Sequence, residues 1–239
     1  MMPGNLFRLE LASTFSGRRR TFFRVGVTVL LGLPFVLVDM PLRARTAGMM
    51  MVILFTTFFG SAVGHTRLLA DRRFARLVLL PISRPLLWLD LVLASVVARF
   101  LPTAIILTLF LLVNVRNVGV VTLAGIYGFL CASLVLLTLL GIATGKLARN
   151  NQEVHLYGAL AVVILAFVCG ITPHPEKLAG IVEVMAWNPV SRLSIVLTQA
   201  ATGSTSYNSV ELIFSTSVLV GIVAIAILRW IAGGTKLNA

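Results

Sequence analysis

Six long apolar runs dominate this sequence and limit the folds that it can adopt. A helix needs roughly 20 mostly apolar residues to cross the hydrocarbon core of a bilayer. The chain is 58% hydrophobic and only 12% charged, whereas soluble domains carry about 25% charged residues. The sequence therefore predicts an all-α membrane protein, a single transmembrane domain over residues 1–239, with six transmembrane helices at about 21–40, 47–64, 86–113, 118–144, 155–173 and 211–232.

The lysines and arginines are distributed unevenly between the segments that connect these runs. If the N-terminus is cytosolic, six spans return the C-terminus to the cytosol. Fourteen of the 20 basic residues then lie on the cytosolic side and five on the outer side, which is the bias that orients membrane proteins. The net charge of +12 is thereby explained, and it does not require a nucleic-acid partner.

The stretch GIATGK, with glycines at Gly141 and Gly145, invites comparison with a nucleotide-binding loop. That loop needs four residues between its glycines and a Ser or Thr after its lysine. Here three residues separate the glycines, and Leu147 follows Lys146. Glycines four apart form a flat helix face that a second helix can approach closely. The pattern therefore predicts helix packing, or simply a helix end, and not a nucleotide site.

Three connecting segments carry helical patterns of their own. Residues 5–16 place Phe7, Leu11 and Phe15 at four-residue spacing, which predicts a helix in the membrane interface, with a frayed tail as the alternative. The outer segment 172–210 contains two semi-apolar stretches, about 177–187 and 191–200, each too short to span. They predict two short external re-entrant helices, which survive at membrane depth only where protein or water satisfies their backbone.

The cytosolic segment 65–85 predicts a short amphipathic helix at about 67–80. Its basic residues are Arg67, Arg72, Arg73 and Arg76, and prolines follow at 81 and 85, where they end the pattern. Two interpretations remain open. The helix either rests on anionic membrane lipid or docks on a cytosolic partner.

Charged residues inside or beside the spans are candidates for a substrate path, because such charges are costly in a membrane and usually functional. Arg99 lies near the middle of the third span. It either faces a substrate, bonds to carbonyls or a carboxylate within the bundle, with Glu211 the most plausible partner, or extends toward the interface. Glu176 and Glu183 lie seven residues apart on one predicted helix face, where they either gate an exit or face solvent.

The residue types needed for catalysis do not come together in the sequence. The three histidines, His65, His155 and His174, fall on both sides of the membrane and cannot share a metal site. No pattern of a nucleophile with a neighbouring base is evident. The sequence therefore predicts a chain that is not an enzyme by itself and holds no metal or cofactor.

The order of these elements resembles that of the type-2 ABC exporter permeases. Sequence similarities are Leu80-Pro81-Ile82-Ser83-Arg84 at the end of the cytosolic helix, FVCGITP over 167–173, and Asn188-Pro189 before the second external helix. The order covers nearly the whole chain, although Asp90 stands where the family often carries a lysine. The resemblance implies an export permease in a prokaryotic plasma (inner) membrane, multi-pass, with both termini cytosolic.

The same resemblance implies partners and roles. Two permease subunits, as a homodimer or a heterodimer, pair around a substrate path, and two separate ABC ATP-binding subunits bind ATP and Mg and supply the energy. The residues implied in coupling to those subunits are Arg72, Arg73, Arg76, Leu77, Leu80, Pro81, Ser83 and Arg84. The alternative is a non-transporting membrane scaffold or sensor whose basic cytosolic helix binds lipid or a signalling partner.

Overall fold

The computed structural model describes residues 5–15, 17–70, 77, 79, 83–115, 119–148, 150–172, 187–203 and 209–233. Every regular element in these ranges is a helix, which confirms the all-α class. The elements are α1 (Asn5–Phe15), α2 (Arg18–Leu37), α3 (Leu42–Leu54), the π-helix η1 (Phe55–Phe59), α4 (Gly60–Ala70), α6 (Arg84–Asn114), α7 (Val120–Leu147), α8 (Asn151–Val168), α10 (Pro189–Thr202) and α11 (Ser209–Gly233).

Three helical stretches are long and apolar enough to cross a membrane. They are Leu42–Leu69, which joins α3, η1 and α4, then Arg84–Asn114 and Val120–Leu147. The spans predicted at 21–40, 155–173 and 211–232 correspond to shorter apolar stretches, at Thr21–Leu37, Gln152–Val168 and Thr216–Trp230. By length and composition, the described helices therefore fit a helical membrane protein.

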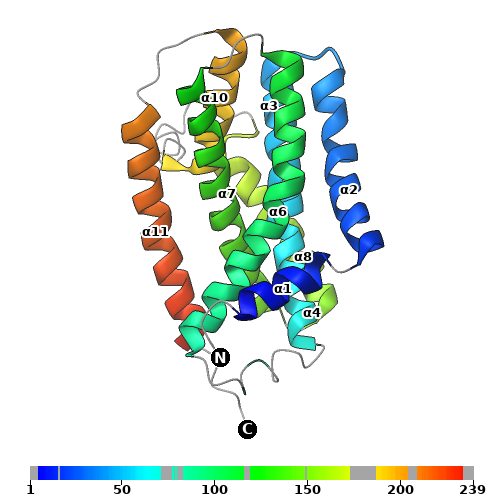
Figure 1. Cartoon of the computed structure of the whole chain (residues 1–239), viewed down its shortest axis with the longest axis vertical. Helices are drawn as coiled ribbons and strands as arrows, with labels where there is room; N and C mark the ends of the chain where they lie inside the picture. The colour runs from blue at the N-terminus through cyan, green and yellow to red at the C-terminus, as the bar shows by residue number, and fades with distance from the viewer. Residues whose placement is uncertain are drawn as a thin grey trace.

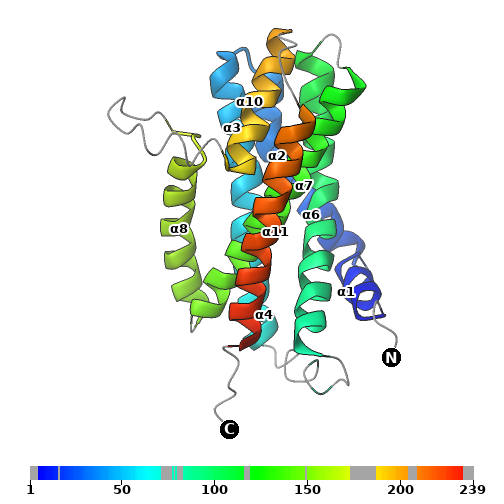
Figure 2. The same cartoon turned by 90° about the vertical axis from the view of Figure 1, so that its left-hand side faces the viewer.

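The long helices run alternately up and down in one bundle (Figures 1 and 2). At the lower end of Figure 1 lie the last turns of α4 and α11 and the first turn of α6. We call this the basic end, because Arg67, Arg84 and Lys146 are in terminal turns of α4, α6 and α7, and Arg229 lies four residues before the end of α11 at Gly233. The opposite, distal end contains the start of α3 and the end of α10. Helix α7 is central and packs against α4, α6, α10 and α11.

Helix α1 forms over nearly the whole stretch where the sequence predicts an interfacial helix. It packs against α6 and α2 and lies at an angle to the long helices (Figure 1). The described helix ends at Phe15, and Ser16, the last residue of the predicted stretch, lies outside the described residues. A helix in this position is the arrangement expected of the interfacial alternative, in place of a frayed tail.

The fifth predicted span ends earlier than its apolar run. Helix α8 stops at Val168, and Gly170 adopts a φ of 67°. The Gly170 amide donates to the Phe167 carbonyl, and the Ile171 amide donates to the Ala166 carbonyl, both at 3.0 Å. This is a Schellman C-cap, for which glycine is the favoured residue. The predicted end at residue 173 was wrong because Gly170 terminates the helix.

The second external stretch forms α10, which packs against the bundle through one buried face. Asn188 caps it by accepting a 2.9 Å hydrogen bond from the Val190 amide, and Pro189 occupies the first turn, both favoured at helix starts. Val190, Leu193 and Leu197 are fully buried. They belong to one core with residues of α3, α6 and α7, so the buried face of α10 is part of the core of the bundle.

The cytosolic helix predicted at 67–80 is only partly visible. Residues 67–70 continue α4 and do not begin a new helix. Leu77 and Leu79 are described, whereas the coupling candidates Arg72, Arg73, Arg76, Leu80 and Pro81 lie outside the described residues. The first external stretch, with Glu176 and Glu183, lies outside them too, apart from Trp187 at its end.

Candidate functional site

A hydrophobic cluster closes the basic end and joins four helices. Its buried members are Leu87, Trp88 and Val92 of α6 and Leu139 and Ile142 of α7. Partly buried side chains pack against them from α4, from the segment between α4 and α6, and from α11: Leu68, Leu77, Ala224, Ile227 and Leu228. We call this set the basal cluster. It links the segment between α4 and α6 to α7 and α11.

Leu77 is a described residue of the predicted coupling helix that packs against this cluster, as does Leu68 in the last turn of α4. Leu79, two residues later, is 85% exposed. Of the two described leucines in the segment between α4 and α6, Leu77 therefore packs against the bundle and Leu79 does not. Ser83 and Arg84 follow, as the N-cap and first residue of α6, and both are exposed.

Helices α4 and α7 meet along the two glycines that the sequence singled out. A Cβ at Gly145 would lie 2.6 Å from the Ala62 carbonyl oxygen, and a Cβ at Gly141 would lie 2.7 Å from Ser61 Cβ. The Thr66 hydroxyl lies 3.1 Å from the Gly145 carbonyl oxygen and bonds across the contact. Both glycines thus lie directly against α4, where a side chain on α7 would not fit.

Two aromatic contacts brace the same end of the bundle. The His65 ring of α4 lies 5.1 Å from the Trp88 ring of α6. The Lys146 ammonium of α7 lies 4.7 Å from the centre of the Trp230 ring of α11 and donates a 3.4 Å hydrogen bond to the Trp230 carbonyl. Cation–π contacts of this kind contribute about 0.5–1 kcal/mol at exposed sites. The His65–Trp88 ring contact holds α4 to α6, and the Lys146–Trp230 contact holds α7 to α11.

Arg99 lies in the middle of α6, where its guanidinium is held by its own helix. It donates to the Ser95 carbonyl at 3.1 Å and to the Ser95 hydroxyl. A Cβ at Gly60 would lie 3.4 Å from the Arg99 Nη2 atom, so the guanidinium borders α4. Glu211 is in the first turn of α11, and its side chain lies outside the described set. The described contacts of Arg99 thus include a carbonyl within the bundle.

The π-helix η1 was not predicted from the sequence, and it directly precedes the Arg99 contact. Its five residues, FTTFF, interrupt an otherwise continuous helix from Leu42 to Ala70. A π-turn inserts an extra residue, rotates the following face, and occurs frequently at functional sites. Phe55 and Phe59 stack at 5.2 Å, and Phe59 contacts the His155 ring of α8 at 5.3 Å. Apolar periodicity does not distinguish this segment from an α-helix.

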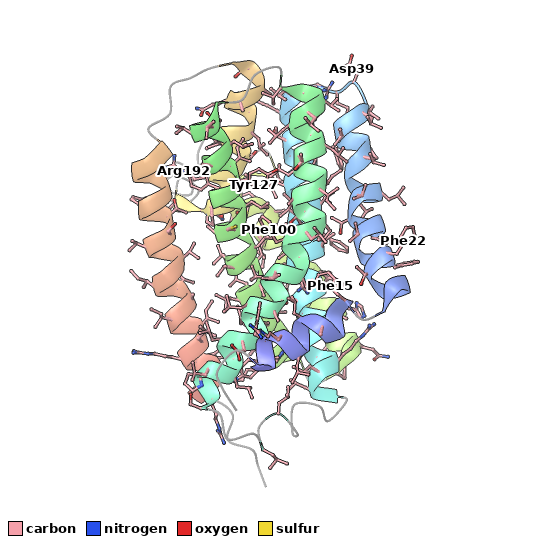
Figure 3. The ribbon with its side chains drawn as sticks, viewed as in Figure 1. Phe15, Phe22, Asp39, Phe100, Tyr127 and Arg192 are labelled. Atoms are coloured by element: carbon pink, nitrogen blue, oxygen red, sulfur yellow. The ribbon has the colours of Figure 1, made fainter. Side chains whose placement is uncertain are left out.

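The distal end carries a polar network that sequence reasoning also missed. Arg45 of α3 forms an ion pair with Asp39 at 2.6 Å and donates to the Asn114 side chain of α6. Asn114 in turn donates to the Phe110 carbonyl at 3.0 Å. Asp39 projects from the turn between α2 and α3 (Figure 3). The network ties that turn to the end of α6, and its only signal in the sequence is polar residues beside two short loops.

The described histidines and cysteines do not converge. His65 and His155 contact the different rings described above, and Cys131 and Cys169 are free thiols. His174 lies outside the described residues. Within the described ranges there is no group of three or more His, Cys, Asp or Glu side chains that could hold a metal ion.

Comparison with known proteins gave no match to a family model, to a curated protein or to a solved structure. Function must therefore be inferred from the geometry of the helices and the two ends of the bundle. At the basic end, the segment between α4 and α6 contributes Leu77 to a cluster with residues of four helices, and Arg99 lies in the middle of α6.

Proposed function

We propose that this chain is the transmembrane permease subunit of an ABC exporter, and that it forms the substrate path while separate ATP-binding subunits supply the energy. In this proposal six helices span a prokaryotic plasma membrane and both termini are cytosolic. A second permease subunit pairs with the first. The chain itself hydrolyses nothing, and ATP and Mg are bound by its two ATPase partners.

The observation that carries this proposal is the attachment of Leu77 to the basal cluster. A partner that pushes on the segment between α4 and α6 pushes on a side chain of the cluster that also contains residues of α6, α7 and α11. Packed interiors resist compression and transmit displacement. A movement of this segment would therefore shift several helices together, as an ATP-driven permease requires.

The residues on either side of Leu77 have distinct roles in the proposal. Arg72, Arg73 and Arg76 face an acidic surface of the ATP-binding subunit. Leu80 and Pro81 end the coupling element, and Ser83 and Arg84 begin α6, which receives the displacement. Complementary charge at such a surface favours the correct partner and speeds association.

The substrate path in this proposal includes Arg99 at mid-depth, with Glu176, Glu183 and Glu211 toward the outer side. Arg99 is half-buried beside Gly60, where a shift of α4 relative to α6 would change its surroundings. The interior of the bundle is mainly apolar. That composition favours a hydrophobic or amphipathic cargo.

The docking role is tested by charge reversal. The Arg72→Glu/Arg76→Glu chain should lose most of its co-purifying ATP-binding subunit, because like charges facing each other across an interface cost several kcal/mol. Arg43→Glu, an exposed position at the distal end, is the control and should retain the subunit. Normal membrane insertion must be confirmed for each variant. Undiminished co-purification with full transport would remove the docking role and leave the basic segment as a topology signal.

The coupling role is tested by a matched pair of leucines. Leu77→Ala should leave the complex assembled but reduce transport of an amphipathic fluorescent dye into inside-out vesicles for each ATP hydrolysed. Leu79→Ala removes the same group from an exposed position and should transport normally. Equal transport by the two variants would show that force does not pass through the basal cluster.

A further inference from the structure

A tyrosine and a threonine hydroxyl meet on an exposed face of the bundle, where α6 and α7 lie side by side. The Tyr127 hydroxyl of α7 lies 2.6 Å from the Thr108 hydroxyl of α6. The Tyr127 ring is held in turn by Phe100, with ring centroids 6.5 Å apart. Figure 3 shows Tyr127 and Phe100 next to each other on this face. Thr108 is exposed and Tyr127 is half-buried.

The direction of these hydrogen bonds can be assigned from the number of protons. The Thr108 hydroxyl donates its single proton to the Ala104 carbonyl oxygen at 2.7 Å. Tyr127 must then donate in the pair with Thr108, since each hydroxyl has one proton and two acceptor positions. The Tyr127 proton is therefore engaged in the hydrogen bond to Thr108. Toward a ligand, the Tyr127 oxygen can act only as a hydrogen-bond acceptor.

The surroundings of this oxygen are apolar. On α6 the exposed neighbours of Thr108 along the same helix face are Leu101, Ile105 and Leu112, and on α7 Leu123 lies one turn before Tyr127. A hydrocarbon chain can lie along such a face. An acceptor surrounded by apolar side chains gains most from a donor, because a polar group left unpaired outside water is costly.

The depth of the pair in the membrane selects the kind of molecule. The 31 residues of α6 extend about 46 Å at 1.5 Å per residue, so a centred helix reaches about 8 Å beyond each side of a hydrocarbon core about 30 Å thick. Thr108 is six residues from the end of α6, which is about 9 Å. The hydroxyl pair therefore lies close to the boundary between headgroups and acyl chains.

We propose that Tyr127, ordered by Thr108, is a binding site for a lipid that carries a free hydroxyl group next to its acyl chains. The lipid hydroxyl donates to the Tyr127 oxygen, and the chains lie along the apolar face toward the middle of the bilayer. This site is independent of the proposed transport function, because it requires no ATP-binding partner. A tyrosine that only anchored the protein in the interface would not distinguish a hydroxyl from an ether.

The test is native mass spectrometry of the full-length protein in detergent with an equimolar mixture of 1,2-dioleoylglycerol and its 3-O-methyl ether. The wild type should retain the free-hydroxyl lipid about two- to tenfold over the ether, which is the value of one net hydrogen bond. Tyr127→Phe should bring that ratio to about one, since the hydrogen bond is lost. The control Tyr157→Phe, an exposed tyrosine of α8, should keep the wild-type ratio.

Thr108→Val provides a second variant if Tyr127→Phe does not fold. Without the threonine oxygen, the Tyr127 proton is released from the pair and can be donated to the ether oxygen. The variant should therefore bind more of the ether, and its ratio should also fall toward one. An unselective wild type, or a selectivity that survives both substitutions, would overturn the proposal.

Discussion

Replacing Gly145 with alanine should separate α4 from α7. The added methyl carbon would lie 2.6 Å from the Ala62 carbonyl oxygen, whereas ordinary contact begins at 3.4 Å. Because the obstacle is backbone, the helices themselves must move apart. Such overpacking costs about 1–3 kcal/mol, and the Thr66 bond to Gly145 adds about 0.5–1.5 kcal/mol. Alanine returns about 1 kcal/mol of helix propensity, which leaves a net destabilisation of about 0.5–3.5 kcal/mol.

The assay is equilibrium unfolding of the purified protein in mixed detergent–SDS micelles. Gly64→Ala is the matched control, because it lies on α4 in the same helix pair and a Cβ there meets nothing within 4 Å. The free energy of unfolding of the Gly64→Ala control should equal that of the wild type or exceed it by up to about 1 kcal/mol. Gly145→Ala with a free energy of unfolding equal to or above that of Gly64→Ala would refute the close packing of α7 on α4.

Three further predictions follow from the two ends of the bundle. Arg45→Met should lower the thermal midpoint more than Asp39→Asn, because Arg45 also bonds Asn114 while the Asp39 carboxylate is solvent-exposed; equal shifts would contradict this. Trp230→Leu should lower the free energy of unfolding by about 0.5–1 kcal/mol, and Trp230→Phe by less. A reporter enzyme fused at Ala239 should be cytosolic and one inserted at Ser204 external, and a cytosolic Ser204 would exclude six spans.

The sequence predicted the positions of the helices because the signals for them are local. Apolar runs of about 20 residues require helices in a membrane, and each of the six runs contains a helix in the structure. The start of α10 at Asn188-Pro189 was also predictable from the sequence, since both residue types favour helix starts. The early end of α8 could also have been predicted from the sequence, because glycine, here Gly170, is a typical C-cap residue.

The candidate site was predictable only in part. The Gly141–Gly145 face could be found because its spacing is a property of one helix. The amphipathic pattern includes Leu77, but it does not indicate that Leu77 packs against the cluster of α6 and α7 residues while Leu79 is exposed.

What the sequence by itself determined is therefore the class of protein, the helices and their orientation bias. Only the tertiary structure decided how each helix is rotated about its axis and how far it is shifted against its neighbours. The pairs Tyr127–Thr108 and Lys146–Trp230 depend on those rotations, as does the burial of α10. The physical reason is that most faces of these helices are apolar, so hydrophobicity alone does not select the contact face, and close packing of particular side chains must do so.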